Sequence, residues 1–352
     1  MNESIYLMKH TIGNKRIDEI DVAKGIGIIM TIIGHNVFEG YVKTFIYSFH
    51  MPLFFVLAGL VMEKKEGSVK TLICEEGKLI RAYFFWSFIY IIFDIVVRII
   101  VLKSPIRLFF LDCYQTFVFW GINVLWFVAT LAIAKIIAYK LWMILNSRKQ
   151  IILALILFFL VYMTTPLVNE IPKMAIYWCI ASLLRVFSAV IFIVIGMNSK
   201  KILLKILNLK NIYSLIIGIL CFCGVSLMGN YMGYIDMRVL MYGDNAILFL
   251  LAALTGTVGT ILISRLLCLF EKVKKCMSYI GKHSLFLMVT HNYFCFDLVM
   301  EKIISTLQLE DELQIVCFKL IILFIVELLM VKIFVEKRNK IALLGCYRIS
   351  GK

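Results

Sequence analysis

The chain has 352 residues, of which 62% are hydrophobic and only 17% are charged, and its formal net charge is +15. This balance excludes an ordinary soluble domain and is typical of a protein that crosses a lipid bilayer many times. Its lysines and arginines cluster between apolar runs, as they do where charge sets membrane topology. We therefore expect no nucleic-acid partner despite the positive charge.

Ten apolar runs predict ten transmembrane helices. Each run reaches the roughly 17–25 residues that a helix needs to cross the bilayer. Backbone groups in lipid must be satisfied within their own segment, so the expected fold is an all-α membrane bundle. The predicted spans are 23–42, 45–62, 82–102, 121–141, 150–168, 177–197, 211–229, 244–268, 283–303 and 314–335.

The distribution of positive charge predicts the topology. The N-terminal segment, every second loop after it and the C-terminal segment hold 25 lysines and arginines, against six in the other loops. By the positive-inside rule, both termini are expected in the cytoplasm. The predicted organisation is a cytoplasmic lead at 1–21, a membrane domain at 22–335 and a cytoplasmic tail at 336–352.

The first expected helix carries two candidate site residues, Lys24 and His35. They are eleven residues apart, or about three helical turns, so both lie on one face and about 16 Å apart. With Lys24 at the cytoplasmic boundary, His35 would lie near the middle of a bilayer core about 30 Å thick. A cation at the inner mouth and an imidazole above it suit a long anionic donor. Asp21 is expected to orient Lys24, and Asn36 to lie on the acceptor side of His35.

Two further histidines are expected near His35. His50 lies close to the outer end of the neighbouring helix, and His291 follows Lys282 by nine residues, about 14 Å along its helix. A single histidine in an apolar helix is usually a packing residue. Two at similar depth, with a third on an adjoining helix, weaken that interpretation and favour a reaction site, because a neutral imidazole is a general base that takes a proton from a hydroxyl.

Arg185 is a deeply placed charge that needs a partner. It is expected about 12 Å below the outer end of its helix. Asp94 and Glu327 are expected at comparable depth and are its candidate partners, and a substrate-binding role is equally open. Asp94 and Arg98 are four residues apart and are expected to pair on one helix face.

We expect no metal site and no permanently bound cofactor. The ten cysteines are scattered, and Cys221 and Cys223 have neither a second pair nor histidines beside them to form a zinc site. The sequence has no His-Glu-x-x-His helix, Gly-x-Ser-x-Gly turn or phosphate-binding glycine loop. Two other classes stay open: a non-enzymatic exporter of glycan intermediates, and a membrane haem protein with His35 and His291 as axial ligands.

Five motifs follow one another along the chain: IDVAKG at 20–25, GH at 34–35, FHMPLFF at 49–55, LWF at 125–127 and IGKHSL at 280–285. Together they resemble the acyltransferase-3 family of membrane O-acyltransferases, most closely its fucose-4-O-acetylase-like branch. The resemblance extends from residue 17 to about 335. It implies a multi-pass protein of the bacterial inner membrane. Such proteins move an acyl group, usually acetyl from cytoplasmic acetyl-CoA, to a sugar hydroxyl at the extracytoplasmic face.

The resemblance also implies roles for individual residues. His35 matches the catalytic histidine of the family, and Lys24 matches the basic residue that precedes it on the CoA side. A basic-x-x-basic motif falls on Lys78 and Arg81, where the CoA phosphates would arrive. The remaining candidates support the site or line the acceptor path: Asp21, Asn36, His50, Arg185 and His291.

The expected function is therefore O-acetylation of a surface polysaccharide or lipid-linked glycan, with acetyl-CoA as a co-substrate. Transfer of succinyl or another acyl group is the alternative within the family. The chain departs from the family pattern at three positions. Ala58 stands where a serine is frequent, Ala82 where a proline is frequent, and His283 where an asparagine is frequent.

Overall fold

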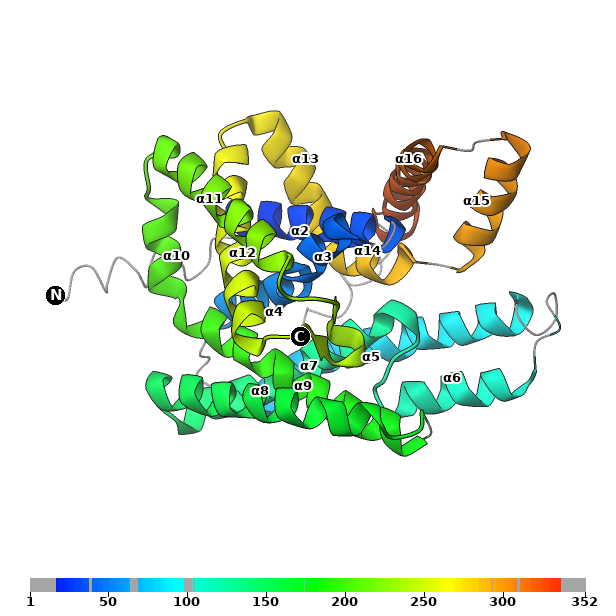
Figure 1. Cartoon of the computed structure of the whole chain (residues 1–352), viewed down its shortest axis with the longest axis horizontal. Helices are drawn as coiled ribbons and strands as arrows, with labels where there is room; N and C mark the ends of the chain where they lie inside the picture. Colours follow the sequence, from blue (N-terminus) through cyan, green and yellow to red (C-terminus); the bar gives the residue numbers. More distant parts are fainter. Residues whose placement is uncertain are drawn as a thin grey trace, which may run out of the picture.

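The computed structural model describes residues 17–37, 40–63, 69–97, 103, 105–173, 175–292, 294–308 and 311–336. The chain is almost entirely helical (Figure 1). Eight of the described helical segments are long and apolar enough to cross a membrane, which confirms the all-α membrane fold. Residues 1–16 of the expected lead, the tail from 337 and Arg98 lie outside the described residues. The cytoplasmic placement of both termini and the Asp94–Arg98 pair stay predictions.

The eight long segments agree closely with the expected spans. The predicted span 211–229, for example, is helix α11 (Asn211–Gly229). The others are α3 with α4 (Tyr41–Tyr47, His50–Leu60), α5 (Val69–Asp94), η2 with α7 (Asn123–Leu125, Trp126–Ile144), α8 (Ser147–Asn169), α9 (Ala175–Asn198), α12 (Ala246–Leu267) and α16 (Glu312–Met330), which continues into η4 (Val331–Glu336).

The remaining elements are shorter or more polar. Helix α2 (Asp18–Asn36) begins with a charged turn and packs against α4, α12, α13, α14 and α16, so it lies at the centre of the bundle. The others are α6 (Arg107–Phe117), α10 (Lys200–Leu207), α13 (Glu271–Lys282), α14 (Ser284–Thr290), α15 (Phe294–Thr306), the antiparallel strands β1 (Ile235–Asp236) and β2 (Met241–Tyr242), and η3 (Met237–Val239) between them.

Two of the ten expected spans are not among the eight long apolar segments of the described residues. The first expected span, 23–42, ends at Asn36 in α2. The span 283–303 is broken: α14 ends at Thr290, a turn follows at His291 and Asn292, and α15 begins at Phe294. The carbonyl of Asn292 accepts a 2.6 Å hydrogen bond from the side chain of Asn123. The turn therefore places the main chain of Asn292 within hydrogen-bond reach of η2.

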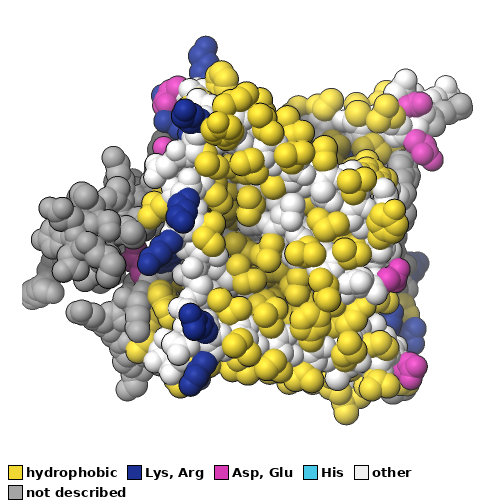
Figure 2. All heavy atoms as spheres, turned by 60° about the vertical axis from the view of Figure 1, so that its left-hand side comes forward, with side chains coloured by type: hydrophobic (Ala, Val, Ile, Leu, Met, Phe, Trp, Pro, Cys, Tyr) yellow, Lys and Arg dark blue, Asp and Glu magenta, His cyan; other side chains and the backbone are white. Residues whose placement is uncertain are grey.

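The surface has the layout of a membrane protein. Figure 2 shows a broad apolar face, with lysines and arginines along one edge and acidic side chains near the opposite one. On α8 the exposed apolar side chains recur every three or four residues, so they form one stripe that faces lipid. They are Ile152, Ile156, Leu160, Met163 and Leu167.

Glycines allow two pairs of helices to cross closely. A Cβ at Gly59 on α4 would collide with the carbonyl oxygen of Ile193 on α9, and one at Gly196 with that of Val56. In the same way, a Cβ at Gly281 on α13 would collide with the main chain of α2. Small residues at such crossings bring helix backbones together in lipid, where packing drives association.

Replacing Gly59 with alanine is expected to destabilise the protein by about 1–3 kcal/mol, because the new methyl group overpacks the α4–α9 crossing. The measurement is the shift in thermal unfolding of the protein in detergent micelles. Gly224→Ala on α11 is the matched control, since a Cβ there would meet only a methyl group at 3.9 Å. Equal unfolding temperatures for both variants would contradict this account of the crossing.

Candidate active site

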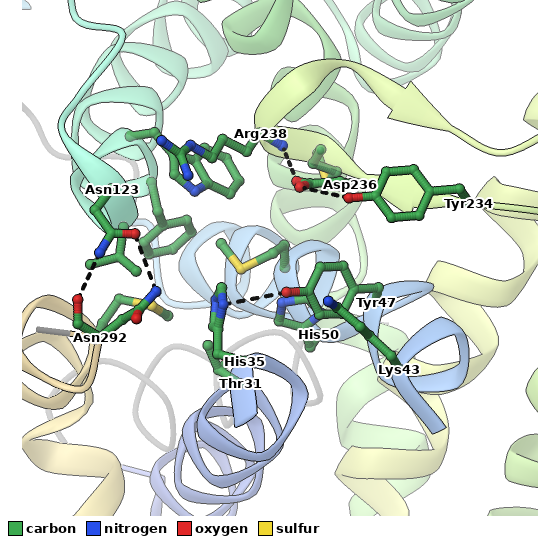
Figure 3. A pocket seen from close by; sticks show the side chains of 16 residues that line it. Thr31, His35, Lys43, Tyr47, His50, Asn123, Tyr234, Asp236, Arg238 and Asn292 are labelled. Atoms are coloured by element: carbon green, nitrogen blue, oxygen red, sulfur yellow. Dashed lines mark hydrogen bonds between the residues drawn. The ribbon is translucent and has the colours of Figure 1, made fainter. Parts of the chain in front are cut away.

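A polar cavity of about 150 Å³ lies at one end of α2 (Figure 3). It collects side chains from segments far apart in the sequence, which only the folded bundle brings together. Its polar lining consists of Thr31 and His35 of α2, Lys43 and Tyr47 of α3, His50 of α4, Asn123 of η2, Tyr234, Asp236 and Arg238 around the β-turn, and Asn292 after α14.

His35 opens into this cavity and stands beside two other rings. Its Nδ1 lies 3.3 Å from the hydroxyl oxygen of Tyr47. Its ring centroid lies 5.1 Å from that of His291. His50 follows on the other side of Tyr47, with 4.8 Å between those two ring centroids. The expected convergence of the three histidines is therefore confirmed.

His50 and His291 are each held by their own helix. Nδ1 of His50 lies 2.9 Å from the carbonyl oxygen of Ile46, and Nδ1 of His291 lies 2.9 Å from that of Leu287. A carbonyl only accepts, so Nδ1 of each ring donates, and Nε2 is the acceptor nitrogen of the neutral imidazole. Nε2 of His291 is buried and has no hydrogen-bond partner among the residues that the structure describes.

Two asparagines close the cavity at the break after α14. The side chain of Asn123 donates to the main chain of Asn292, and the side chain of Asn292 donates back to the Asn123 amide oxygen at 3.2 Å. Figure 3 shows this reciprocal pair facing His35 across the cavity. The break in the expected helix 283–303 therefore helps to form the site.

No motif or periodicity in the sequence marks five of the cavity residues: Tyr47, Lys43, Asn123, Arg238 and Asn292. Of these five residues, Tyr47 is the easiest to identify from the sequence, because it lies three residues before the candidate His50 and next to a short polar break. Asn123, Arg238 and Asn292 come from short connecting segments whose positions depend on the packing of distant helices.

Arg185 has partners other than the two expected carboxylates. Its side chain is completely buried, at 0% exposure. Nε donates to the hydroxyl of Thr130 at 3.0 Å, and the other guanidinium nitrogens donate to main-chain carbonyls. Those acceptors are Phe119 at 3.0 Å, Trp120 at 2.9 Å and Arg238 at 3.1 Å.

Two aromatic rings complete the surroundings of this arginine. The guanidinium carbon lies 4.7 Å from the ring centroid of Trp120 and 5.1 Å from that of Trp126, which is cation–π geometry. Glu327, one expected partner, accepts instead from the Thr290 hydroxyl at 2.5 Å. Arg185 therefore ties the segment just before η2 to η3, and both η2 and η3 contribute side chains to the cavity.

The hairpin formed by β1, η3 and β2 places a carboxylate, Asp236, and a guanidinium, Arg238, at the cavity. The main-chain N–H of Arg238 donates to the Asp236 carboxylate at 2.8 Å, and the Tyr234 hydroxyl donates to the same carboxylate at 3.3 Å. Burial raises the pKa of the Asp236 carboxyl, and the hydrogen bond from Arg238 opposes that shift. Burial likewise lowers the pKa of the Arg238 guanidinium, which remains a cation at neutral pH.

The basic residues expected on the donor side lie away from this cavity. Nζ of Lys24 is 4.0 Å from the carboxylate of buried Asp21, so the expected pairing of these two residues is confirmed. Lys78 and Arg81 are exposed and three residues apart on α5. None of the three basic residues lines the cavity around His35. Their contact with CoA stays a prediction.

The side chain of Asn36 is used within its own helix. It donates to the Ile32 carbonyl at 2.8 Å, and it is not among the residues that line the cavity. Its part in an acceptor path stays a prediction. Thr31 lines the cavity one turn before His35.

The fold and the site define a multi-pass membrane protein with a polar, histidine-containing cavity inside its bundle. A family model described as an acyltransferase domain matches residues 17–332, which is almost the whole helical part. The chain therefore belongs to the acyltransferase-3 family, and the expectation at family level is confirmed. No curated protein matches the chain, and no solved structure does.

Proposed function

We propose that this membrane acyltransferase moves an acetyl group from cytoplasmic acetyl-CoA to a hydroxyl of an extracytoplasmic carbohydrate. The acceptor would be a surface polysaccharide or a lipid-linked glycan, the enzyme would lie in a bacterial inner membrane, and the fucose-4-O-acetylase-like branch would be its nearest group. The observation that carries this proposal is the position of His35, in a polar cavity beside Tyr47 and His291.

In the proposed reaction, His35 takes the proton of the acceptor hydroxyl as its oxygen attacks the thioester carbonyl. A C–O bond forms, the C–S bond breaks, and the proton passes to the departing CoA thiolate. Tyr47 holds the imidazole through Nδ1, which leaves Nε2 of His35 to face the substrate. The unpartnered Nε2 of His291 supplies a second acceptor atom next to the reacting ring.

On the cytoplasmic side, we assign the CoA phosphates to Lys24, Lys78 and Arg81. Phosphate oxygens make charge-assisted hydrogen bonds with such side chains, which are stronger than neutral ones. Lys78 and Arg81 follow Glu76 by two and five residues on α5. Oε1 of Glu76 forms an ion pair with Nζ of Lys135 on α7 at 2.5 Å. This pair joins α5 to α7 and so holds the basic segment against the bundle.

Replacing Lys78 and Arg81 together with glutamine is expected to raise KM for acetyl-CoA about tenfold or more, because each charged hydrogen bond is worth about 1.5–3 kcal/mol. The value of kcat should change little, since neither side chain lies at the cavity. The matched control replaces Arg148 and Lys149, also an exposed arginine and lysine, with glutamine. Equal KM values for the two double variants would contradict the assignment.

The function itself is tested by the acetyl content of surface glycans from cells with and without the gene, measured by mass spectrometry. Purified protein in nanodiscs is then given acetyl-CoA labelled in the acetyl group, with succinyl-CoA in parallel, and the deacetylated glycan as acceptor. We expect label in the glycan from acetyl-CoA. Unchanged acetylation together with loss of glycan from the surface would instead favour an exporter.

A further inference from the structure

The cavity beside His35 carries more positive than negative charge. Lys43 and Arg238 line it, and Asp236 is the one carboxylate among its described lining residues. The Asp236 oxygens already accept hydrogen bonds from the Tyr234 hydroxyl and from the main chain of Arg238. One carboxylate therefore faces two cations. Neutral sugar hydroxyls do not require this excess of charge.

The guanidinium of Arg238 has an unused donor. Its Nε is buried and has no hydrogen-bond partner in the described part of the chain. The main chain of the same residue is fixed from both sides, because its carbonyl accepts from Arg185 at 3.1 Å and its N–H donates to Asp236. A buried donor without an acceptor is costly and calls for an explanation. An acceptor group on a ligand would supply it.

The chemistry of that ligand follows from the donor. The planar fork of N–H groups on arginine matches a carboxylate or a phosphate, to which it donates two parallel hydrogen bonds. Lys43, which stands over the Tyr47 ring at 5.5 Å, adds a second cation on the His35 side of the cavity. An oxyanion is therefore the group that this part of the cavity fits best.

The size of the cavity limits which part of a substrate it accepts. Its volume of about 150 Å³ is below the roughly 300–1,000 Å³ of pockets that hold a whole small molecule. It therefore suits one end of a substrate, such as a single sugar unit. Because His35 and Arg238 line the same space, the hydroxyl and the anionic group belong to the same or adjacent units.

We infer that Arg238 and Lys43 form an oxyanion subsite, so that the acceptor is an acidic carbohydrate with a carboxylate or phosphate close to the acylated hydroxyl. This inference rests on the proposed function, because it describes the acceptor of that same site. The phosphates of CoA are assigned to Lys78 and Arg81, which do not line the cavity.

Binding of three probes to the purified protein in nanodiscs tests the inference: glucose, glucuronate and glucose 1-phosphate. Saturation-transfer NMR and competition titrations report binding without any acyl transfer. We expect at least one anionic probe to bind about tenfold or more tightly than glucose. Preference for glucuronate would identify a carboxylate as the bound group, and preference for glucose 1-phosphate a phosphate.

Arg238→Gln is expected to remove this preference while leaving glucose binding unchanged, and Lys43→Gln to reduce it. The loop should keep its conformation in Arg238→Gln, because Arg185 and Asp236 hold only the main chain of residue 238. Arg107→Gln is the matched control, since Arg107 is exposed at the start of α6 and does not line the cavity.

Similar affinities for all three probes, no binding of either anionic probe, or an unchanged preference in Arg238→Gln would overturn the subsite. Binding of free CoA is measured as well. Its affinity should be unchanged in Arg238→Gln, and a weaker affinity for CoA in that variant would assign the cavity to the acyl donor. These measurements distinguish a failure of the oxyanion subsite from a failure of the proposed acetyl transfer. Intact acetyl transfer without anion preference removes only the subsite, whereas anion preference without any transfer removes the proposed reaction.

Discussion

Replacing His35 with alanine is expected to lower the rate of acyl transfer by about 10²–10⁴-fold, the usual contribution of a general base. The imidazole is exposed to the cavity, with the Tyr47 hydroxyl and the His291 ring beside it. Its removal therefore costs little packing, and the variant should fold and insert normally. The measurement is acetyl transfer to glycan by purified protein, with insertion checked by the yield of monodisperse protein in detergent.

His283→Ala is the matched control for this experiment. Like His50 and His291, His283 has its Nδ1 2.9 Å from the carbonyl four residues earlier, that of Tyr279, but it does not line the cavity. It should retain nearly full activity. His50→Ala and His291→Ala should give intermediate losses, because both rings flank the reacting group. Full activity in His35→Ala would rule out the mechanism.

Replacing Arg185 with methionine is expected to destabilise the protein by about 3–5 kcal/mol, because several acceptors lose their donor and a buried group left unsatisfied costs about 1–3 kcal/mol. The substitution leaves the carbonyls of Phe119, Trp120 and Arg238 and the hydroxyl of Thr130 without this donor. The bonds to Thr130 and Trp120 are buried, where water does not replace them, and those to Phe119 and Arg238 are partly buried. Thermal unfolding of the purified protein in detergent measures the effect.

Arg185→Lys should be almost as unstable, because one ammonium group cannot reach acceptors spread around a planar guanidinium. Arg265→Met is the matched control. Arg265 also donates to a carbonyl, that of Leu207 at 2.8 Å, and to the side chains of Asn211 and Ser214, but it is partly exposed. Its loss should cost about 1 kcal/mol, because water can take over its bonds. Equal stability of Arg185→Met and the wild type would refute the structural role of Arg185.

The folded positions of α11 and His291 show how far local sequence information reaches. The apolar run 211–229 coincides with α11 because length and hydropathy decide whether a segment can satisfy its backbone in lipid. His291 lies beside His35 as its depth predicted, since the rise per residue of a helix is constant. In both cases the signal lies within one segment.

Arg185 and the segment 283–303 show where that information ends. The depth of Arg185 predicted a need for partners, but its actual acceptors are carbonyls near residues 119 and 238, more than 50 positions away in the chain. The turn after Thr290 is joined by two hydrogen bonds to Asn123, a residue of another segment. No periodicity within a segment encodes either contact.

The amino-acid sequence by itself determined that this protein is a helical membrane protein, because hydropathy and charge act locally along each segment, and its motifs carry the resemblance to the acyltransferase-3 family. Only the tertiary structure decided that Tyr47, His50, His291 and Arg238 share the surroundings of the His35 imidazole, and that Arg185 holds the loops around them. Those contacts join distant segments, and they exist only when the packed helices bring the segments into register.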